Sequence, residues 1–210
     1  MKYLKSYKLF ESDSYIEVRE SIDYILINLR DEGIEYDIVE YPKIGMFEIT
    51  IYEVENSLVN SEIKRLLGYV SEEGYKSFVG KHIPVENSNE SRDMMIVSLL
   101  KPNDLTDKLE KYFLDTINSC VVKTSKDFPD DRFWVNKEGT IIFRQDPKNG
   151  YFWCKYDPFW SFFSKTNHLQ TQEIQVFMKY LLGQHLKLEG LTPTVPLTRT
   201  TAINWDNISN

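Results

Sequence analysis

The stretch that most constrains the fold runs from Thr140 to Leu188 and is dense in large aromatic side chains. It holds two of the four tryptophans. Because aromatic side chains bury more area than other residues, this stretch should form a core. Ile141 and Phe143 alternate as in a strand, residues 147–150 have the Asn-Gly chemistry of a tight turn, and residues 151–155 return, which predicts a β-hairpin. The pattern indicates a structural core and not a catalytic site.

A pair of helices is predicted after this hairpin. Asp157 followed by Pro158 is a favourable helix start, and the phenylalanines that follow indicate a helix buried on several sides. The last helix should begin at Thr171, carry apolar residues at helical spacing and end at Gly190. Before the hairpin, residues 103–119 favour another helix, and Phe133 to Val135 should form a strand.

The N-terminal half shows helical and alternating periodicity in turn. A capping box at Ser14 begins a helix that ends at Gly33. Two half-buried strands follow, joined by a turn over residues 42–45, and then a helix capped near Ser57 or Asn60. The remaining elements are strands over residues 75–83 and 94–100. The order α-β-β-α-β-β predicts an antiparallel sheet with two helices on one face.

The chain therefore divides into four predicted parts. They are a leader over residues 1–13, an α+β domain over residues 14–102, a β-hairpin and helical domain over residues 103–190, and an extended Thr- and Pro-rich tail over residues 191–210. The predicted fold class is α+β.

Charge is distributed unevenly between the two halves. Residues 1–100 hold 11 Lys and Arg against 19 Asp and Glu, whereas residues 101–210 hold 14 against 13. The acidic half should be repelled by nucleic acid and by anionic lipid. No apolar run approaches the roughly 20 residues that span a bilayer. Lys5 and Lys8 interrupt what could have been a secretory signal, which predicts a cytoplasmic location.

Candidate chemistry is sparse. Two cysteines, Cys120 and Cys154, cannot build a disulfide framework, and buried free thiols are expected. His82, His168 and His185 are scattered without a second ligand at helical spacing, which argues against a metal site.

The acidic groups at residues 35–37 and 130–131 could hold Mg²⁺, but exposed strand and turn residues explain them more simply. No phosphate loop, nucleophile elbow or dinucleotide fingerprint is present. We therefore expect no enzymatic activity, no catalytic residue, no metal and no cofactor.

Several segments resemble uncharacterised proteins of large tailed bacteriophages. They are the opening MKYLKSYKLFES, residues 29–34 and 71–75, and in the second half residues 149–153, 156–163, 173–175 and 188–193. The resemblance covers most of the chain and implies a viral origin, in the cytoplasm of an infected host cell. It implies no activity and no functional residues, because none is assigned to these proteins.

The leader carries a sharper resemblance. Short segments rich in lysine and aromatic residues that end in Leu- or Ile-x-Glu resemble the capsid-targeting peptides of such phages. Leu9, Phe10 and Glu11 match this motif. The resemblance implies cleavage after Glu11, with Ser12 as the new N-terminus, and incorporation into the virion.

The leading hypothesis is a phage-encoded, non-enzymatic protein that acts through protein contacts and is associated with the virion or its assembly. An unpaired strand edge, or a tail carrying Trp205 with Thr194 and Arg199, would bind phage or host proteins. The alternative is an early intracellular effector that binds a host protein or a small ligand. A third option is a nucleic-acid-binding regulator that uses the C-terminal helices. The last helix offers only Lys179 as a cation on its outer face, which argues against this option.

Overall fold

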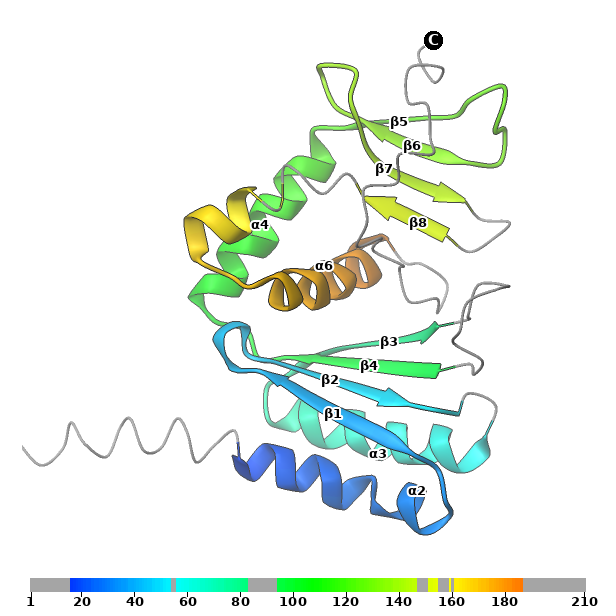
Figure 1. Cartoon of the computed structure of the whole chain (residues 1–210), viewed down its shortest axis with the longest axis vertical. Coiled ribbons are helices and arrows are strands. Elements are labelled where there is room, and N and C mark those ends of the chain that lie inside the picture. The colour runs from blue at the N-terminus through cyan, green and yellow to red at the C-terminus, as the bar shows by residue number, and fades with distance from the viewer. Residues whose placement is uncertain are drawn as a thin grey trace, which may run out of the picture. The chain divides into compact units, whose positions relative to one another are not determined.

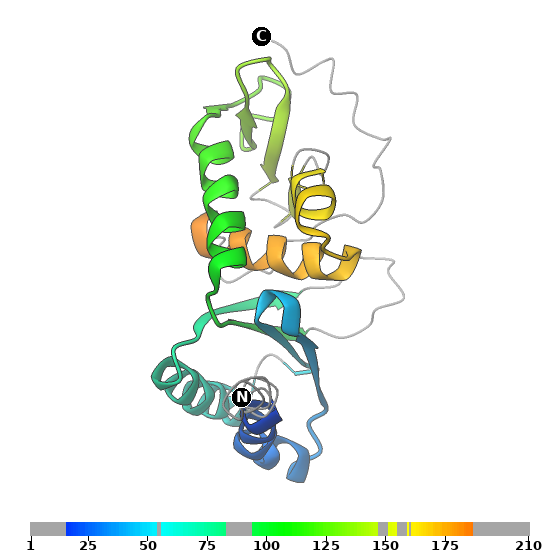
Figure 2. The same ribbon diagram turned by 90° about the vertical axis from the view of Figure 1, so that its left-hand side faces the viewer.

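The computed structural model describes residues 16–53, 56–82, 94–146, 151–154, 159 and 161–186. Contacts within the chain divide it into two compact units, residues 1–101 and residues 102–210. Both units combine helices with antiparallel strands (Figures 1 and 2), which confirms the predicted α+β class. Each unit is described by itself below.

The first unit contains a four-stranded antiparallel sheet with strand order β1-β2-β4-β3. Its helices lie on one face of that sheet (Figure 1). The described elements are a helix over residues 16–25, α2 (Ile27–Asp31), β1 (Tyr36–Tyr41), the 3-10 turn η1 (Pro42–Ile44), β2 (Met46–Ile51), α3 (Ser57–Glu72), β3 (Lys76–His82) and β4 (Met94–Leu100). The predicted order of elements is confirmed.

Local sequence explains where these elements begin and end. Gly33 adopts a left-handed conformation with φ of 76°, and the amide of Ile34 donates to Leu29 O, which closes the helix before β1. Gly45 also adopts a left-handed conformation and returns the chain into β2. The N-cap of α3 is Asn56 and not the predicted Ser57 or Asn60, because the Asn56 side chain accepts the amide of Leu58 at 2.8 Å.

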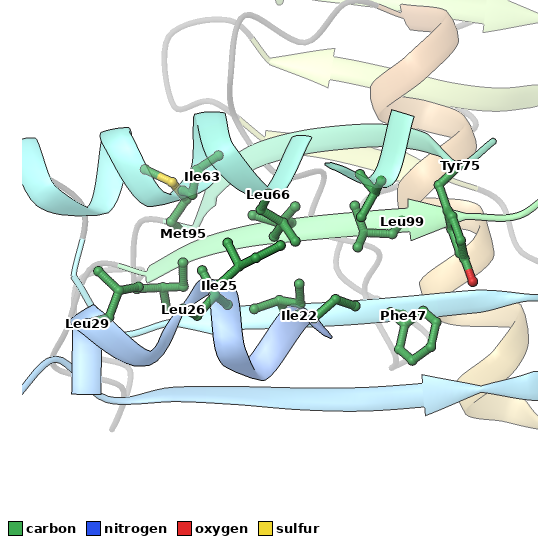
Figure 3. Close-up of a cluster of buried hydrophobic side chains, with 14 of the residues drawn as sticks. Ile22, Ile25, Leu26, Leu29, Phe47, Ile63, Leu66, Tyr75, Met95 and Leu99 are labelled. Carbon is green, nitrogen blue, oxygen red and sulfur yellow. The ribbon is translucent and has the colours of Figure 1, made fainter. Parts of the chain in front are cut away.

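The core of the first unit forms between these helices and the sheet. Ile22, Leu26 and Leu29 of the N-terminal helical segments are fully buried. Figure 3 shows them pointing toward α3 and the central strands, where Leu66 and Leu99 lie. Alternate residues of β2 and β4 contribute to the same cluster, as the period of two in a strand requires. This core fixes which side chains of β1 remain available at the sheet edge.

The second unit also contains a four-stranded antiparallel sheet, in the order β5-β6-β7-β8. The predicted hairpin and the predicted strand are confirmed, and β5 adds a strand that the sequence did not predict. The described elements are α4 (Asp104–Asn118), β5 (Val121–Lys123), β6 (Arg132–Val135), β7 (Ile141–Asp146), β8 (Tyr151–Cys154), the π-helical segment η2 (Ser161–Thr166) and α6 (Thr171–Leu186). The predicted helix start at Asp157 and helix end at Gly190 lie outside the described residues.

Aromatic rings build the core of the second unit, as predicted. Phe113 of α4 lies 5.9 Å from Phe143 of β7 and 5.6 Å from Phe159, measured between ring centroids. Phe163 in turn contacts Phe177 of α6. These rings join the sheet to the helices around it.

One acidic residue in the second unit was misjudged from the sequence. Asp131, expected as an exposed turn residue, is buried, and its Oδ2 accepts the Nε of Arg144 at 2.6 Å. Its carboxylate is therefore part of an internal ion pair with Arg144.

Candidate functional site

A pocket of about 540 Å³ opens at the beginning of β1 in the first unit. It lies where the helical segment ends at Gly33 and the chain enters the edge of the sheet. Its lining residues come from α2, from the turn after it, from β1 and from the residue that follows β2. They are Arg30, Gly33, Ile34, Glu35, Tyr36, Asp37 and Tyr52.

Tyr36 is held on the helix side of this pocket by a charged pair. Its hydroxyl donates to Asp23 Oδ1 at 2.8 Å, and Arg30 Nη2 donates to the Tyr36 oxygen at 3.0 Å. The Arg30 guanidinium also lies 5.1 Å above the tyrosine ring. Burial, followed by the hydrogen bond to Asp23, raises the pKa of Tyr36 to about 12. The phenol of Tyr36 is therefore neutral near pH 7, and its hydrogen bonds hold the side chain at the side of the pocket.

Tyr52 borders the pocket with a second tyrosine–carboxylate contact. Its hydroxyl donates to Asp37 Oδ2 at 2.6 Å. This hydrogen bond is the largest of the causes that raise the pKa of Tyr52. The pocket thus presents two neutral phenols, the exposed carboxylates of Glu35 and Asp37, and the guanidinium of Arg30, which is paired with Asp23. Such a lining favours a cationic group over an anion.

Beyond the pocket, β1 forms an edge of the four-stranded sheet. The amide of Tyr52 donates to Glu35 O, and these two residues stand opposite each other in the β1–β2 register. In an antiparallel pair, hydrogen-bonded positions alternate with positions whose backbone groups point away. The N–H and C=O groups of Tyr36, Ile38 and Glu40 therefore point outward from the sheet.

The surroundings of this edge are strongly acidic. Residues 16–41 hold eight Asp and Glu and two Arg, a balance of −6. Both arginines are already paired, because Arg19 Nη1 lies 2.6 Å from Glu40 Oε1 and Arg30 Nη2 lies 2.8 Å from Asp23 Oδ1. In the middle of the strand, Val39 is 45% exposed and offers an apolar contact between acidic neighbours.

The site residues that the sequence suggested belong to the two terminal segments of the chain. The cleavage residues Leu9, Phe10, Glu11 and Ser12 lie outside the described residues, and so do Thr194, Arg199 and Trp205 of the tail. The sequence did predict that an unpaired strand edge could bind a partner, but not which strand it would be.

Among the described side chains, those of His168, His185 and Cys120 do not converge on a site either. His185 Nε2 lies 2.8 Å from Glu110 Oε1, whereas His168 is exposed. Cys120 is partly exposed, contrary to the expected burial, because it follows the last turn of α4, where its Sγ donates to Thr116 O. Within the described ranges, no three His, Cys, Asp or Glu side chains are grouped to hold a metal ion.

Two broader findings bear on function. Among the described helices, none combines the length and the apolar character needed to traverse a membrane. Comparison with protein-family models, with curated proteins and with solved structures gives no match for this chain.

Proposed function

We propose that this chain is a non-enzymatic protein-interaction protein that binds an extended, lysine- or arginine-bearing segment of a partner along β1. The observation that carries the proposal is an edge strand with outward-pointing backbone groups at Tyr36, Ile38 and Glu40, set in acidic surroundings. An added strand gains main-chain hydrogen bonds along such an edge, and its alternate side chains provide specificity.

Charge decides which strand is accepted. Glu35 and Asp37 flank the start of β1, so an acidic segment would meet like charges in close register. The same repulsion disfavours pairing of β1 with β1 of another copy. A lysine or arginine near the pocket instead meets Glu35, Asp37 and the ring of Tyr52. The acidic edge thus protects against unspecific pairing and selects a basic partner.

The resemblance to phage proteins suggests the biological setting of this contact. We propose a role in the virion or its assembly, with an intracellular effector that binds a host protein as the alternative. Mass spectrometry of purified phage particles distinguishes these two settings. A virion protein should be present in the particles, and it should begin at Ser12 if the leader is cut. Absence from particles, together with copurification of a host protein, would favour the effector.

The binding mode itself is tested with peptides on the full chain. A labelled peptide that alternates lysine and valine should bind, as measured by fluorescence polarisation, and the matched glutamate–valine peptide should not. Glu40→Pro removes an outward-pointing amide and leaves the bonds to β2 intact, so binding should fall about tenfold, the equivalent of one hydrogen bond. Glu40→Ala removes the same carboxylate but keeps the amide, and it should bind more tightly than the proline variant.

A second experiment tests whether the acidic residues of β1 select a basic peptide. Asp37→Lys should weaken binding of the lysine peptide and improve binding of the glutamate peptide, because the charge beside the pocket is reversed. Equal affinities of Glu40→Pro and Glu40→Ala for the lysine peptide, with both variants folded by circular dichroism, would show that the partner does not pair with this edge.

A further inference from the structure

A second surface lies on the solvent side of the first helical segments. By the N-terminal helix we mean residues 16–25 together with α2. Three of its apolar side chains are exposed, Ile16 by 56%, Tyr24 by 72% and Ile27 by 39%. Tyr24 and Ile27 are three residues apart across the turn at Leu26, and Ile16 lies eight residues, about 12 Å of helix, before Tyr24, with the exposed Glu20 between them. Single exposed apolar residues are common, and these three are considered together, as a row, because they occur within twelve residues of one helical segment, opposite its buried side.

This row is not part of the core that the same helix builds. Ile22, Leu26 and Leu29 are fully buried against α3 and the sheet (Figure 3). The helix reaches β1 through other side chains, since Arg19 contacts Glu40 and Arg30 contacts Tyr36. The row formed by Ile16, Tyr24 and Ile27 is therefore a third side of the helix.

We infer that this row is a docking site for an amphipathic helix of another protein that carries lysine or arginine beside its apolar stripe. The exposed acidic residues Glu17, Glu20 and Asp31 lie on the same helix as the row. A partner with cations at the flanks of its apolar stripe pairs with these carboxylates while its apolar residues cover the row.

The charge also decides against other occupants. A second copy of this helix would bring equal acidic surfaces together, and anionic lipid or nucleic acid would meet the same repulsion. Ridges formed by side chains three and four residues apart fit the grooves of another helix, which favours a helical partner over an extended one. The surface is thus independent of the strand-binding edge of β1.

The probe is a helical peptide of about 18 residues, five turns, that carries leucine on one face and lysine on the other. Its binding to the full chain is measured by fluorescence polarisation, beside a matched peptide with glutamate in place of lysine. The lysine peptide should bind, and Tyr24→Ser combined with Ile27→Ser should weaken it by at least about tenfold. Val122→Ser is the matched control, because Val122 is also exposed but lies on β5, beside Lys123.

Two further arms separate this inference from the proposed function. Glu40→Pro and Glu40→Ala should bind the helical peptide equally well, since both variants lose the contact with Arg19 and differ only at the outward-pointing amide of β1. Tyr24→Ser alone should also lower the affinity for the helical peptide. The variant should still fold, because the Tyr24 side chain is 72% exposed. The inference is overturned if the glutamate peptide binds as well as the lysine peptide, or if both serine variants keep the affinity of the original chain.

Discussion

The buried pair between Asp131 and Arg144 leads to the sharpest prediction on stability. The two side chains are 7% and 8% exposed, and Arg144 Nε donates to Asp131 Oδ2 at 2.6 Å. The guanidinium carbon also lies 4.4 Å from the centroid of the Phe128 ring and 5.4 Å from that of Phe133. Asp131→Asn removes the carboxylate charge that this buried cation contacts, which should lower the free energy of unfolding by about 3–5 kcal/mol.

The double variant provides the decisive comparison. Arg144→Met removes the cation that the buried Asp131 carboxylate contacts, and it should also lower the free energy of unfolding by about 3–5 kcal/mol. Asp131→Asn combined with Arg144→Met removes both charges and keeps similar volumes, so its loss should be smaller than either single loss. The two substitutions should therefore be strongly non-additive.

Tryptophan fluorescence isolates the unit concerned. All four tryptophans, at positions 134, 153, 160 and 205, lie in residues 102–210, so their emission during urea unfolding reports on the second unit. With an m-value of about 1–3 kcal/mol/M, each single variant should lower the urea midpoint by roughly 1–5 M. Single losses below about 1 kcal/mol, or a double loss equal to their sum, would refute the assignment of this pair as a coupled internal ion pair.

Two further predictions concern Tyr36 and the N-cap of α4. The pKa of Tyr36 is raised from 10.0 to about 12, so its contribution to stability should be complete below pH 10 and be lost as the pH rises from 10 to 12. Ultraviolet titration should detect the ionisation of Tyr36 near pH 12, and Asp23→Asn should lower this pKa. An unchanged pKa in the variant would contradict the role of the hydrogen bond. Asn103 and Thr106 form a reciprocal cap on α4, so Asn103→Ala should destabilise the second unit by about 1 kcal/mol. A urea midpoint equal to that of the original chain would contradict that cap.

Sequence patterns predicted the elements of the first unit because most of them bury one side, whereas β4, buried along residues 95–100, forms a continuous apolar run. The apolar spacing from Val18 to Leu29 could be satisfied only by a helix against a core, and β4 matches the predicted strand over residues 94–100. The short strand β5 escaped prediction for the opposite reason. All three of its residues are exposed, so no hydrophobic pattern marks it, and only pairing with β6 makes it a strand.

Asp131 shows a second limit of sequence reasoning. Turn propensity favours exposed aspartate, and nothing within a few residues signals that Arg144 will reach it from β7. The π-helical turns of η2 are similar, because their aromatic residues fit an α-helix equally well by periodicity. In both cases the outcome depends on residues distant in sequence, which local patterns do not contain.

The candidate site depends on such distant pairing even more strongly. Whether a strand is an edge follows from the order β1-β2-β4-β3, and β1 and β2 looked alike as half-buried strands in the sequence. The acidic balance was visible at once, but it served only to exclude nucleic acid and lipid as partners. Once β1 is known to be the edge, the same carboxylates indicate which partner could bind, because they lie beside outward-pointing backbone groups. In the proposed function, charge selects the partner, and the outward-pointing backbone groups of β1 bind it.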